Sequence, residues 1–416
     1  MKMKPTFGGP GAYVIGEEEK REVMEVLESG YLFRYGSEDD PNFKRKVVTL
    51  ENEVADFIRV KHAVAVNSGT SALLTCLAAL GIGPGDEVIV PGYTFIASIS
   101  SIIMSRAIPI LAEIDESLTL DPVDVEKKIT DKTKAIMPVH MLGNPCNMDI
   151  IMDIARKHHL LVIEDCAQAA GASYHGKRVG SIGDIAVFSL NVFKTINAGD
   201  GGIVVTDNYA YYERAFAFHD QGHKPMRMGV EVGKRSIIGL NFRMNELTGA
   251  FALAQVRKIN RILATLHEKK NKLKTVIAGI PGIGFRKIND ENGECATLLT
   301  LLFKDQATAD AFAEKAGTKT LAHSGWHVYN YMEQILQKKT ATTYPCPYEC
   351  PAYGKDIQYY PHMLPQTDNI LNRAINISVG VVDKGLGSGF GININSTDDE
   401  INAVAEKIEK YMKEIS

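Results

Sequence analysis

Short apolar runs alternate with longer amphipathic stretches over most of the chain. The runs at 64–67, 108–111, 135–138 and 160–163 predict strands, because each is apolar and bounded by polar or turn-forming residues. The stretches between several of these runs carry apolar residues at helical spacing. This alternation of strand and helix predicts a mostly parallel mixed sheet with helices packed on it.

The C-terminal part of the chain has a different pattern. Its apolar run at 295–303 predicts a strand, and the stretches at 307–317 and 398–415 predict helices. Because 416 residues exceed one ordinary core, we expect two domains. The fold class predicted is α/β, with a large domain at 1–258 that includes an N-terminal arm and a smaller α+β domain at 259–416.

Composition and charge argue against several classes of function. Hydrophobic residues at 45% and charged residues at 23% are ordinary globular values. A net charge of −4 without a basic stripe gives no reason to expect nucleic acid as a partner. The sequence has no long uncharged apolar run, so we expect no membrane span. The first residues, MKMKPTFGGPG, lack the apolar core of a signal peptide, and we expect a cytoplasmic protein.

The cysteines indicate reduced thiols. Six cysteines in a chain of this length are too few for a disulfide framework. Cys346 and Cys350 form the one close pair, and the nearest histidine downstream is His362. A tetrahedral zinc site needs a second pair of ligands at suitable spacing, so we expect no metal.

Candidate chemistry centres on Lys194, in the stretch 188–202. Apolar runs at 185–188 and 203–206 flank this stretch and predict two buried strands around the lysine. An isolated ammonium is costly to remove from water, so such a site favours the neutral amine, which attacks carbonyls and forms imines. The alternative is a surface lysine on a loop, where lysines are more common.

Two upstream features favour the reactive lysine. Asp165 follows the run at 160–163, which predicts a central parallel strand with the acid at its carboxyl end, where open α/β sheets bind ligands. Ser68, Gly69 and Thr70 lie between a short strand and a helical stretch, and small residues that open a helix form an anion site. An anion site, a buried acid and an imine-forming lysine are the parts that pyridoxal phosphate requires.

These candidate residues lie within six longer stretches that together resemble a known family. They are NSGTSALL (67–74), GPGDEVIVPGYTFIAS (83–98), PVHMLGNPCNMD (138–149), IEDCAQAAGASYHGKRVGSIGD (163–184), FSLNVFKTINAGDGGIVVTD (188–207) and GLNFRMNELTGAFALAQ (239–255). Together they resemble the DegT/DnrJ/EryC/StrS family of fold-type I, pyridoxal-phosphate-dependent sugar aminotransferases. The resemblance extends over nearly the whole chain, although each stretch alone is a weak signal.

The resemblance implies roles for the residues around the cofactor ring. Lys194 is expected to join the cofactor as an imine and then to move the substrate proton as a base. Asp165 is expected to pair with the ring nitrogen and keep it protonated, and Gln168 to donate to the phenolic oxygen. Phe95 is expected to stack on the ring, whereas the pattern alone fits an ordinary core phenylalanine equally well.

The resemblance also implies how the cofactor phosphate is held. Ser68, Gly69, Thr70 and Ser189 are expected to bind the phosphate within one subunit. Asn241 is expected to reach the phosphate of the neighbouring subunit. We therefore expect a homodimer with shared active sites, and the sequence leaves assembly beyond the dimer open.

The substrates follow from the same resemblance. L-glutamate is the expected amino donor and an oxo-sugar the acceptor. The stretches 219–246 and 379–395 are most similar to transaminases that install the 8-amino group of 8-amino-3,8-dideoxy-manno-octulosonate. This similarity predicts the 8-oxo form of 3,8-dideoxy-manno-octulosonate as the acceptor, in lipopolysaccharide sugar biosynthesis, and such an anionic acceptor suits the basic segment 219–236. A nucleotide-linked keto-sugar or an inosose is the alternative acceptor.

Several assignments stay open at this level. A solvated loop is as good an interpretation of 219–236 as a substrate site, and a loop at 31–46 could be mobile or plain surface. His140 follows a strand and could approach the site, and the glycine-rich stretch 385–391 is expected to be a flexible loop. Basic and aromatic side chains that could meet the substrate are His219, Lys224, Arg227, Lys234, Arg235, His323, Trp326 and His327.

Two other classes of function compete with an aminotransferase. A pyridoxal-phosphate-dependent sugar dehydratase of the same family would carry histidine in place of Lys194. A regulatory protein built on this fold would carry a DNA-binding extension or lack the lysine. The sequence shows neither change, so an aminotransferase remains the prediction.

Overall fold

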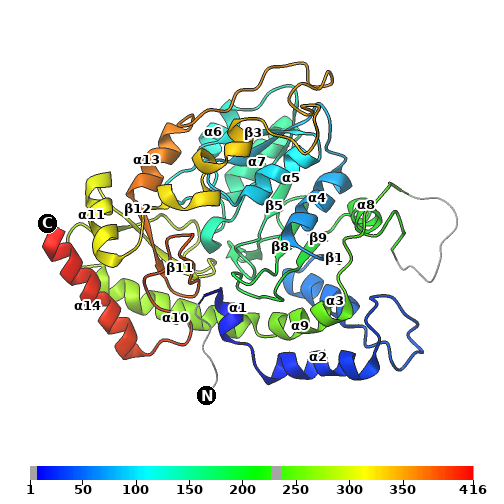
Figure 1. Cartoon of the computed structure of the whole chain (residues 1–416), viewed down its shortest axis with the longest axis horizontal. Coiled ribbons are helices and arrows are strands. Elements are labelled where there is room, and N and C mark those ends of the chain that lie inside the picture. The colour runs from blue at the N-terminus through cyan, green and yellow to red at the C-terminus, as the bar shows by residue number, and fades with distance from the viewer. Residues whose placement is uncertain (1–6, 226–235, 416) are drawn as a thin grey trace.

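A mixed sheet forms the centre of the computed structural model, which describes residues 7–225 and 236–415 (Figure 1). In spatial order its strands are β1 (His62–Val66), β9 (Gly202–Thr206), β8 (Ile185–Ser189), β5 (Leu161–Asp165), β4 (Thr133–Ile136), β2 (Glu87–Pro91) and β3 (Ile108–Ala112). Neighbours from β8 to β3 pair in parallel, whereas β9 runs antiparallel to β8 and β1. The predicted mostly parallel mixed sheet is confirmed.

Strand β5 lies in the middle of this sheet, between β4 and β8. Its residues are apolar up to Ile163, and the strand continues to Asp165, two residues beyond the predicted run. Both sheet faces are covered at this point: Ile163 belongs to one core cluster and Val162 to another. Asp165 is therefore the last strand residue, at the carboxyl edge where the parallel neighbours also end.

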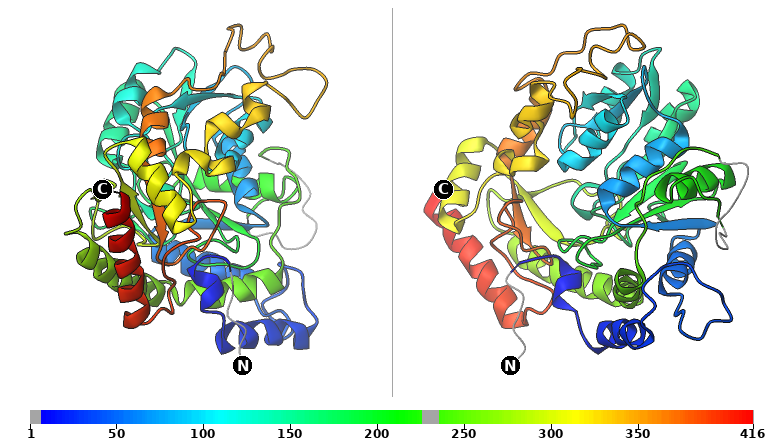
Figure 2. Two further views of the ribbon diagram at one scale, coloured as in Figure 1. Left: turned by 60° about the vertical axis from the view of Figure 1, so that its left-hand side comes forward. Right: turned by 45° about the vertical axis from the view of Figure 1, so that its right-hand side comes forward.

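Helices pack on both faces of the sheet (Figure 2). On one face, Leu73, Ile99 and Phe216 share a core with the strand residues Val90 and Val187. They come from α4 (Gly69–Leu80), α5 (Ile96–Met104) and α8 (Tyr209–His219), whereas α6 (Pro122–Lys127) and α7 (Met148–His158) border another core cluster. The N-terminal helices α2 (Glu17–Ser29) and α3 (Lys46–Ile58) lie against α9 (Glu246–Val256).

The C-terminal part contains an antiparallel sheet of order β10 (Gly284–Phe285), β11 (Leu298–Leu302) and β12 (Ala374–Ser378). Its main helices are α10 (Ile259–Ile277), α11 (Gln306–Ala316), α13 (Pro365–Arg373) and α14 (Asp398–Ile415). These elements match the predicted strand at 295–303 and the predicted helices. Helices α9 and α10 meet close to residue 258, where the domain boundary was predicted; the division itself stays a prediction.

The N-terminal segment crosses to the C-terminal part, since Gly8 and Val382 exchange backbone hydrogen bonds of 3.1 and 2.9 Å. The remaining elements are α1 (Pro10–Tyr13), α12 (Glu333–Leu336), the ribbon β6 (Ser173–Tyr174) and β7 (Lys177–Arg178), and 3-10 turns at 141–143, 321–323, 325–327 and 329–331. Within the described residues, no helix is both long enough and apolar enough to cross a membrane.

Candidate active site

A cavity of about 580 Å³ lies at the carboxyl ends of β5 and β8. Its lining combines strand ends and helix starts of the large sheet with loop residues of the C-terminal part. The predicted site residues among its lining are Ser68, Gly69, Thr70, Phe95, Asp165, Gln168, Ser189 and Lys194. Asn241 is exposed and lies outside the cavity of its own chain.

Lys194 lies in the loop between β8 and β9 and lines the cavity, half-buried. Burial lowers the pKa of its amine, and the carboxylates of Asp165 and Asp383 partly oppose that shift. The amine is therefore closer to its neutral form than an exposed lysine would be. The surface-lysine alternative does not describe this position.

Asp165 is fixed by two hydrogen bonds at the end of β5. The Ser98 hydroxyl donates to Oδ2 at 2.8 Å, and the backbone N–H of Ala167 donates to Oδ1 at 3.0 Å. Burial raises the pKa of Asp165, and these hydrogen bonds and the Lys194 ammonium act in the opposite direction. Sequence reasoning missed Ser98, whose one signal is its place in the first turn of α5, three residues after Phe95.

The start of α4, beside β8, has the features of an anion site. Ser68 caps the helix, and its Oγ accepts the N–H of Ser71 at 3.0 Å. The N–H groups of Gly69 and Thr70 make no hydrogen bond to another described residue. A Cβ at Gly69 would lie 2.9 Å from the Cβ of Ser189, so glycine permits the helix start to approach the strand end. Free N–H groups and the positive helix end suit a phosphate.

The amide of Gln168 has a defined orientation. The backbone N–H of Leu142 donates to its Oε1 at 3.1 Å, which leaves the NH2 group available as a donor. Leu142 has a left-handed backbone, with φ 56°. The guanidinium of Arg286, from the C-terminal part, holds this turn by donating to the carbonyls of Met141 and Leu142 at 3.3 and 2.9 Å. No local sequence signal marks Arg286, because its partners lie more than 140 residues away.

Aromatic and imidazole rings form another part of the wall. The rings of Phe95 and His327 lie 5.3 Å apart at 52°. Phe95 is 39% exposed, so it is a cavity residue and only partly core. Burial, reinforced by the nearby Lys194 charge, lowers the pKa of His327 to about 4. Trp326 also lines the cavity. His323 lies outside it, and its Nδ1 is hydrogen-bonded to the Tyr331 hydroxyl at 2.8 Å.

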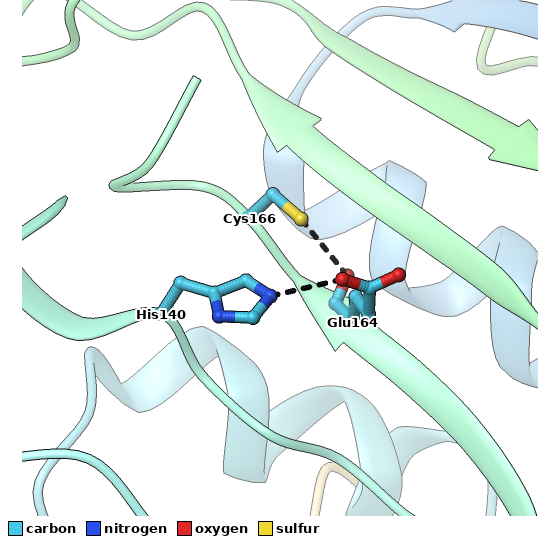
Figure 3. Close-up of side chains that lie close together, drawn as sticks. All are labelled: His140, Glu164 and Cys166. Atoms are coloured by element: carbon cyan, nitrogen blue, oxygen red, sulfur yellow. Dashed lines mark hydrogen bonds and ion pairs between the residues drawn. The ribbon is translucent and has the colours of Figure 1, made fainter. Parts of the chain in front are cut away.

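His140, which by its place after a strand could approach the site, does not line the cavity. It is fully buried, and its Nε2 lies 3.1 Å from Glu164 (Figure 3). Its Nδ1 accepts the backbone N–H of Cys146 at 2.9 Å. Cys166 completes a cluster of side chains that ligate metals in other proteins. Both ring nitrogens are already engaged, so the cluster is a hydrogen-bonded support for the end of β5.

Glu164 is the anionic member of this cluster. Its carboxylate also accepts the backbone N–H groups of Gly180, Ile182 and Gly183 at 2.7–2.9 Å. Although burial acts to raise it, the hydrogen bonds from His140 and the backbone hold the pKa of Glu164 below its ordinary value. The carboxylate is fully satisfied without a cation.

The basic segment is only partly described. His219 is buried, hydrogen-bonded to the Phe216 carbonyl and close to Arg34, and burial lowers its pKa to about 3. It is neither solvated nor in this cavity. Lys224 is exposed and also outside the cavity. Arg227, Lys234 and Arg235 lie outside the described residues.

Comparison with known proteins identifies the family. The model of the DegT/DnrJ/EryC1/StrS aminotransferase family matches residues 14–382. The chain belongs to this family. Membership confirms the predicted fold class, the predicted aminotransferase class and the pyridoxal phosphate cofactor.

Individual members of the family show how far the likeness extends. Over 247 residues the chain is 42% identical to GDP-perosamine synthase of Caulobacter vibrioides, covering 59% of this chain and 63% of that protein. It is 36% identical over 303 residues to the spore coat polysaccharide biosynthesis protein SpsC of Bacillus subtilis, covering 71% and 75%. The crystal structure of 3-amino-5-hydroxybenzoic acid synthase matches with a TM-score of 0.78 at 25% identity, over 99% of this chain and 100% of that one.

The cavity residues fit the family's cofactor. The free N–H groups at the start of α4 suit its phosphate, and the acid at the end of β5 suits its ring nitrogen. The Gln168 amide can donate to a phenolic oxygen, and Lys194 supplies the amine. Phe95 has the exposure that a stacking residue requires.

Proposed function

We propose that this chain transfers an amino group from L-glutamate to an oxo-sugar, with pyridoxal phosphate as its cofactor. The observation that carries the proposal is the convergence in one cavity of Lys194, whose pKa is lowered, Asp165 at a central strand end, and an anion site at 68–70. This combination also argues against a dehydratase, which would lack the lysine.

Each of the cavity residues has a separate role in the proposed amino-group transfer. When bound, the cofactor supplies an electrophilic aldehyde and a ring that accepts electrons from the substrate α-carbon. Lys194, as the neutral amine, binds at the aldehyde and, once released, takes and returns the substrate proton. Asp165, held by Ser98, keeps a proton on the ring nitrogen. Gln168 orients the ring through its phenolic oxygen.

A homodimer is part of the proposal. Asn241, predicted to serve the neighbouring subunit, is exposed next to two exposed apolar side chains, Ile238 at 89% and Leu240 at 52%. Exposed apolar side chains of this size favour burial against another chain. We therefore assign Asn241 to the phosphate of a partner subunit. Asn241→Ala in a dimeric protein should then weaken cofactor binding without changing assembly, as read by equilibrium dialysis and sedimentation.

The acceptor we propose is the 8-oxo form of 3,8-dideoxy-manno-octulosonate, the sugar acid suggested by the stretches 219–246 and 379–395. The relative named GDP-perosamine synthase favours a second candidate, a nucleotide-linked keto-sugar. Both acceptors present a carbonyl next to hydroxyl groups, and they differ in carrying a carboxylate or a diphosphate.

One experiment separates the two acceptors. The holoenzyme is first mixed with L-glutamate, and conversion of its cofactor to pyridoxamine phosphate is followed by absorbance. Either acceptor is then added, and amino-sugar product is measured by mass spectrometry. Product with the octulosonate supports the proposal. If only a GDP-linked keto-sugar gives product, that sugar replaces the octulosonate as the assigned acceptor. If glutamate does not convert the cofactor, the assignment of glutamate as the amino donor is refuted.

A further inference from the structure

Lys319 places a second lysine on the cavity wall, in addition to Lys194. Among the described residues that line the cavity, Lys194 and Lys319 are the only lysines or arginines. Lys194 is committed to the cofactor, and the imidazole of His327, with its pKa lowered to about 4, is neutral at physiological pH. Lys319 is therefore the one permanent positive charge that this described lining offers to a substrate.

The ammonium of Lys319 has no acidic partner in residues 7–225 and 236–415. It makes none of the ion pairs or side-chain hydrogen bonds found there, although the side chain is half-buried. Lys315 and Lys355 of the C-terminal part are paired, Lys315 at 2.8 Å from Glu414 and Lys355 at 2.6 Å from Asp131, whereas the exposed Lys384 makes no ion pair among the described residues. A partly desolvated, unpaired ammonium gains most from an anion brought by a ligand.

The fold holds the Lys319 backbone in place. Gly317, with φ 62°, caps the end of helix α11, and the Thr318 hydroxyl donates to the carbonyl of Gly387 at 2.7 Å. A Cβ at Gly387 would lie 3.2 Å from the carbonyl oxygen of Lys319 and 3.5 Å from its Cγ. The glycine-rich stretch 385–391 thus gives the lysine stem room beside the cavity, which is a packing role that sequence reasoning did not foresee.

Charge balance shows what Lys319 can bind. The cavity lining also carries the acids Asp165, Asp200 and Asp383. L-Glutamate would bring two carboxylates, and a sugar acid one, into a cavity whose lining already carries three acids. Burying a carboxylate there without a cation is unfavourable. The anion site proposed for the cofactor phosphate, at 68–70, lies on the large-sheet side of the same cavity, whereas Lys319 belongs to the C-terminal part.

We propose that Lys319 binds a substrate carboxylate and so selects acidic substrates; this rests on the proposed aminotransferase function. The carboxylate can belong to the glutamate donor or to a sugar-acid acceptor, and the two half-reactions distinguish these sources. In both cases the ammonium acts as a donor to a carboxylate oxygen and takes no part in proton transfer at the reacting carbon.

The test compares Lys319→Met, Lys319→Arg and Lys384→Met in the holoenzyme. Lys384 is the matched control, because it is an exposed lysine of the C-terminal part that follows the lining residue Asp383 but does not itself line the cavity. Lys319→Met should raise the half-saturating concentration of glutamate, or of the octulosonate acceptor, about 10- to 100-fold and leave the limiting rate nearly unchanged. Lys319→Arg should restore most of the affinity. Unchanged half-saturation in both half-reactions overturns the proposal.

A binding measurement separates this proposal from the proposed function. Glutarate, a dicarboxylate without an amine, is titrated into each holoenzyme by calorimetry. If wild type binds glutarate and Lys319→Met loses about 10-fold or more of that affinity, the carboxylate site stands, even if glutamate fails to convert the cofactor. Equal affinities, or weakened cofactor binding in place of weakened glutarate binding, would overturn it.

Discussion

The two walls of the cavity are built in different ways. The wall from the large sheet carries Asp165 at the end of β5, and the anion site at the start of α4, on regular elements. The wall from the C-terminal part carries Lys319, His327 and Asp383 on loops and short turns. Strand ends and helix starts fix side chains precisely enough to hold a cofactor, whereas loops can vary with the substrate. We infer that the first wall supplies the chemistry and the second the choice of substrate.

The largest expected effect on catalysis comes from neutralising one acid of each wall in separate variants. Asp165→Asn keeps the shape of the side chain but removes the charge that we propose holds a proton on the cofactor ring. Its loss of a charge-assisted hydrogen bond should lower kcat by about 10- to 100-fold. Asp383→Asn, at a cavity acid of the other wall, should change kcat much less. Steady-state kinetics of the two variants decides this, and equal losses would contradict the division between the walls.

Breaking the support behind β5 should lower the stability of the folded chain. His140→Asn leaves the N–H of Cys146 without its acceptor and removes a donor to Glu164, all in a fully buried place. We expect a loss of about 2–4 kcal/mol in the free energy of unfolding, measured in urea. His175→Asn is the control, because His175 pairs with Asp149 at the exposed surface, where such pairs contribute little. Equal losses would show that the cluster in Figure 3 is not a support.

The smallest expected effect concerns pH and the C-terminal wall. The pKa of His327 is about 4 in the folded chain, below its ordinary value of 6.5. The unfolded chain therefore binds the proton more readily, and stability falls as pH drops from about 6.5 to about 4. Urea unfolding at pH 7 and pH 5 should show this loss, on the order of 1 kcal/mol, in wild type and less of it in His327→Asn. His323→Asn, outside the cavity, should behave as wild type.

The contrast between the walls also explains what could be predicted. Asp165 and the residues at 68–70 follow short apolar runs, so local pattern places them at a strand end and a helix start, and Lys194 lies between two apolar runs, so the pattern places it in the loop that joins two strands. The terminal helix at 398–415 was predicted with the bounds observed. Strand ends and helix bounds are set mainly by hydrophobic periodicity and turn residues within a few positions, so local sequence is enough to predict them.

The rest depends on contacts between distant parts of the chain. Arg286 fixes the turn that orients Gln168, and Lys319 meets the cavity only because the C-terminal part packs beside β5 and β8. Its place after a strand left open that His140 could approach the site, but its two ring nitrogens are engaged by Glu164 and by the backbone N–H of Cys146. The pattern of one strand cannot show which side chain of a neighbouring segment fills the space beside it.

The central claim is that Lys194 is the residue that joins the cofactor. The most direct measurement is borohydride reduction of the purified holoenzyme, followed by proteolysis and mass spectrometry of the labelled peptide. The account predicts a single pyridoxyl group on Lys194, and no label and no absorbance near the blue edge of the visible in Lys194→Ala. A label on another lysine, or a Lys194→Ala protein that keeps both its colour and its label, would contradict it.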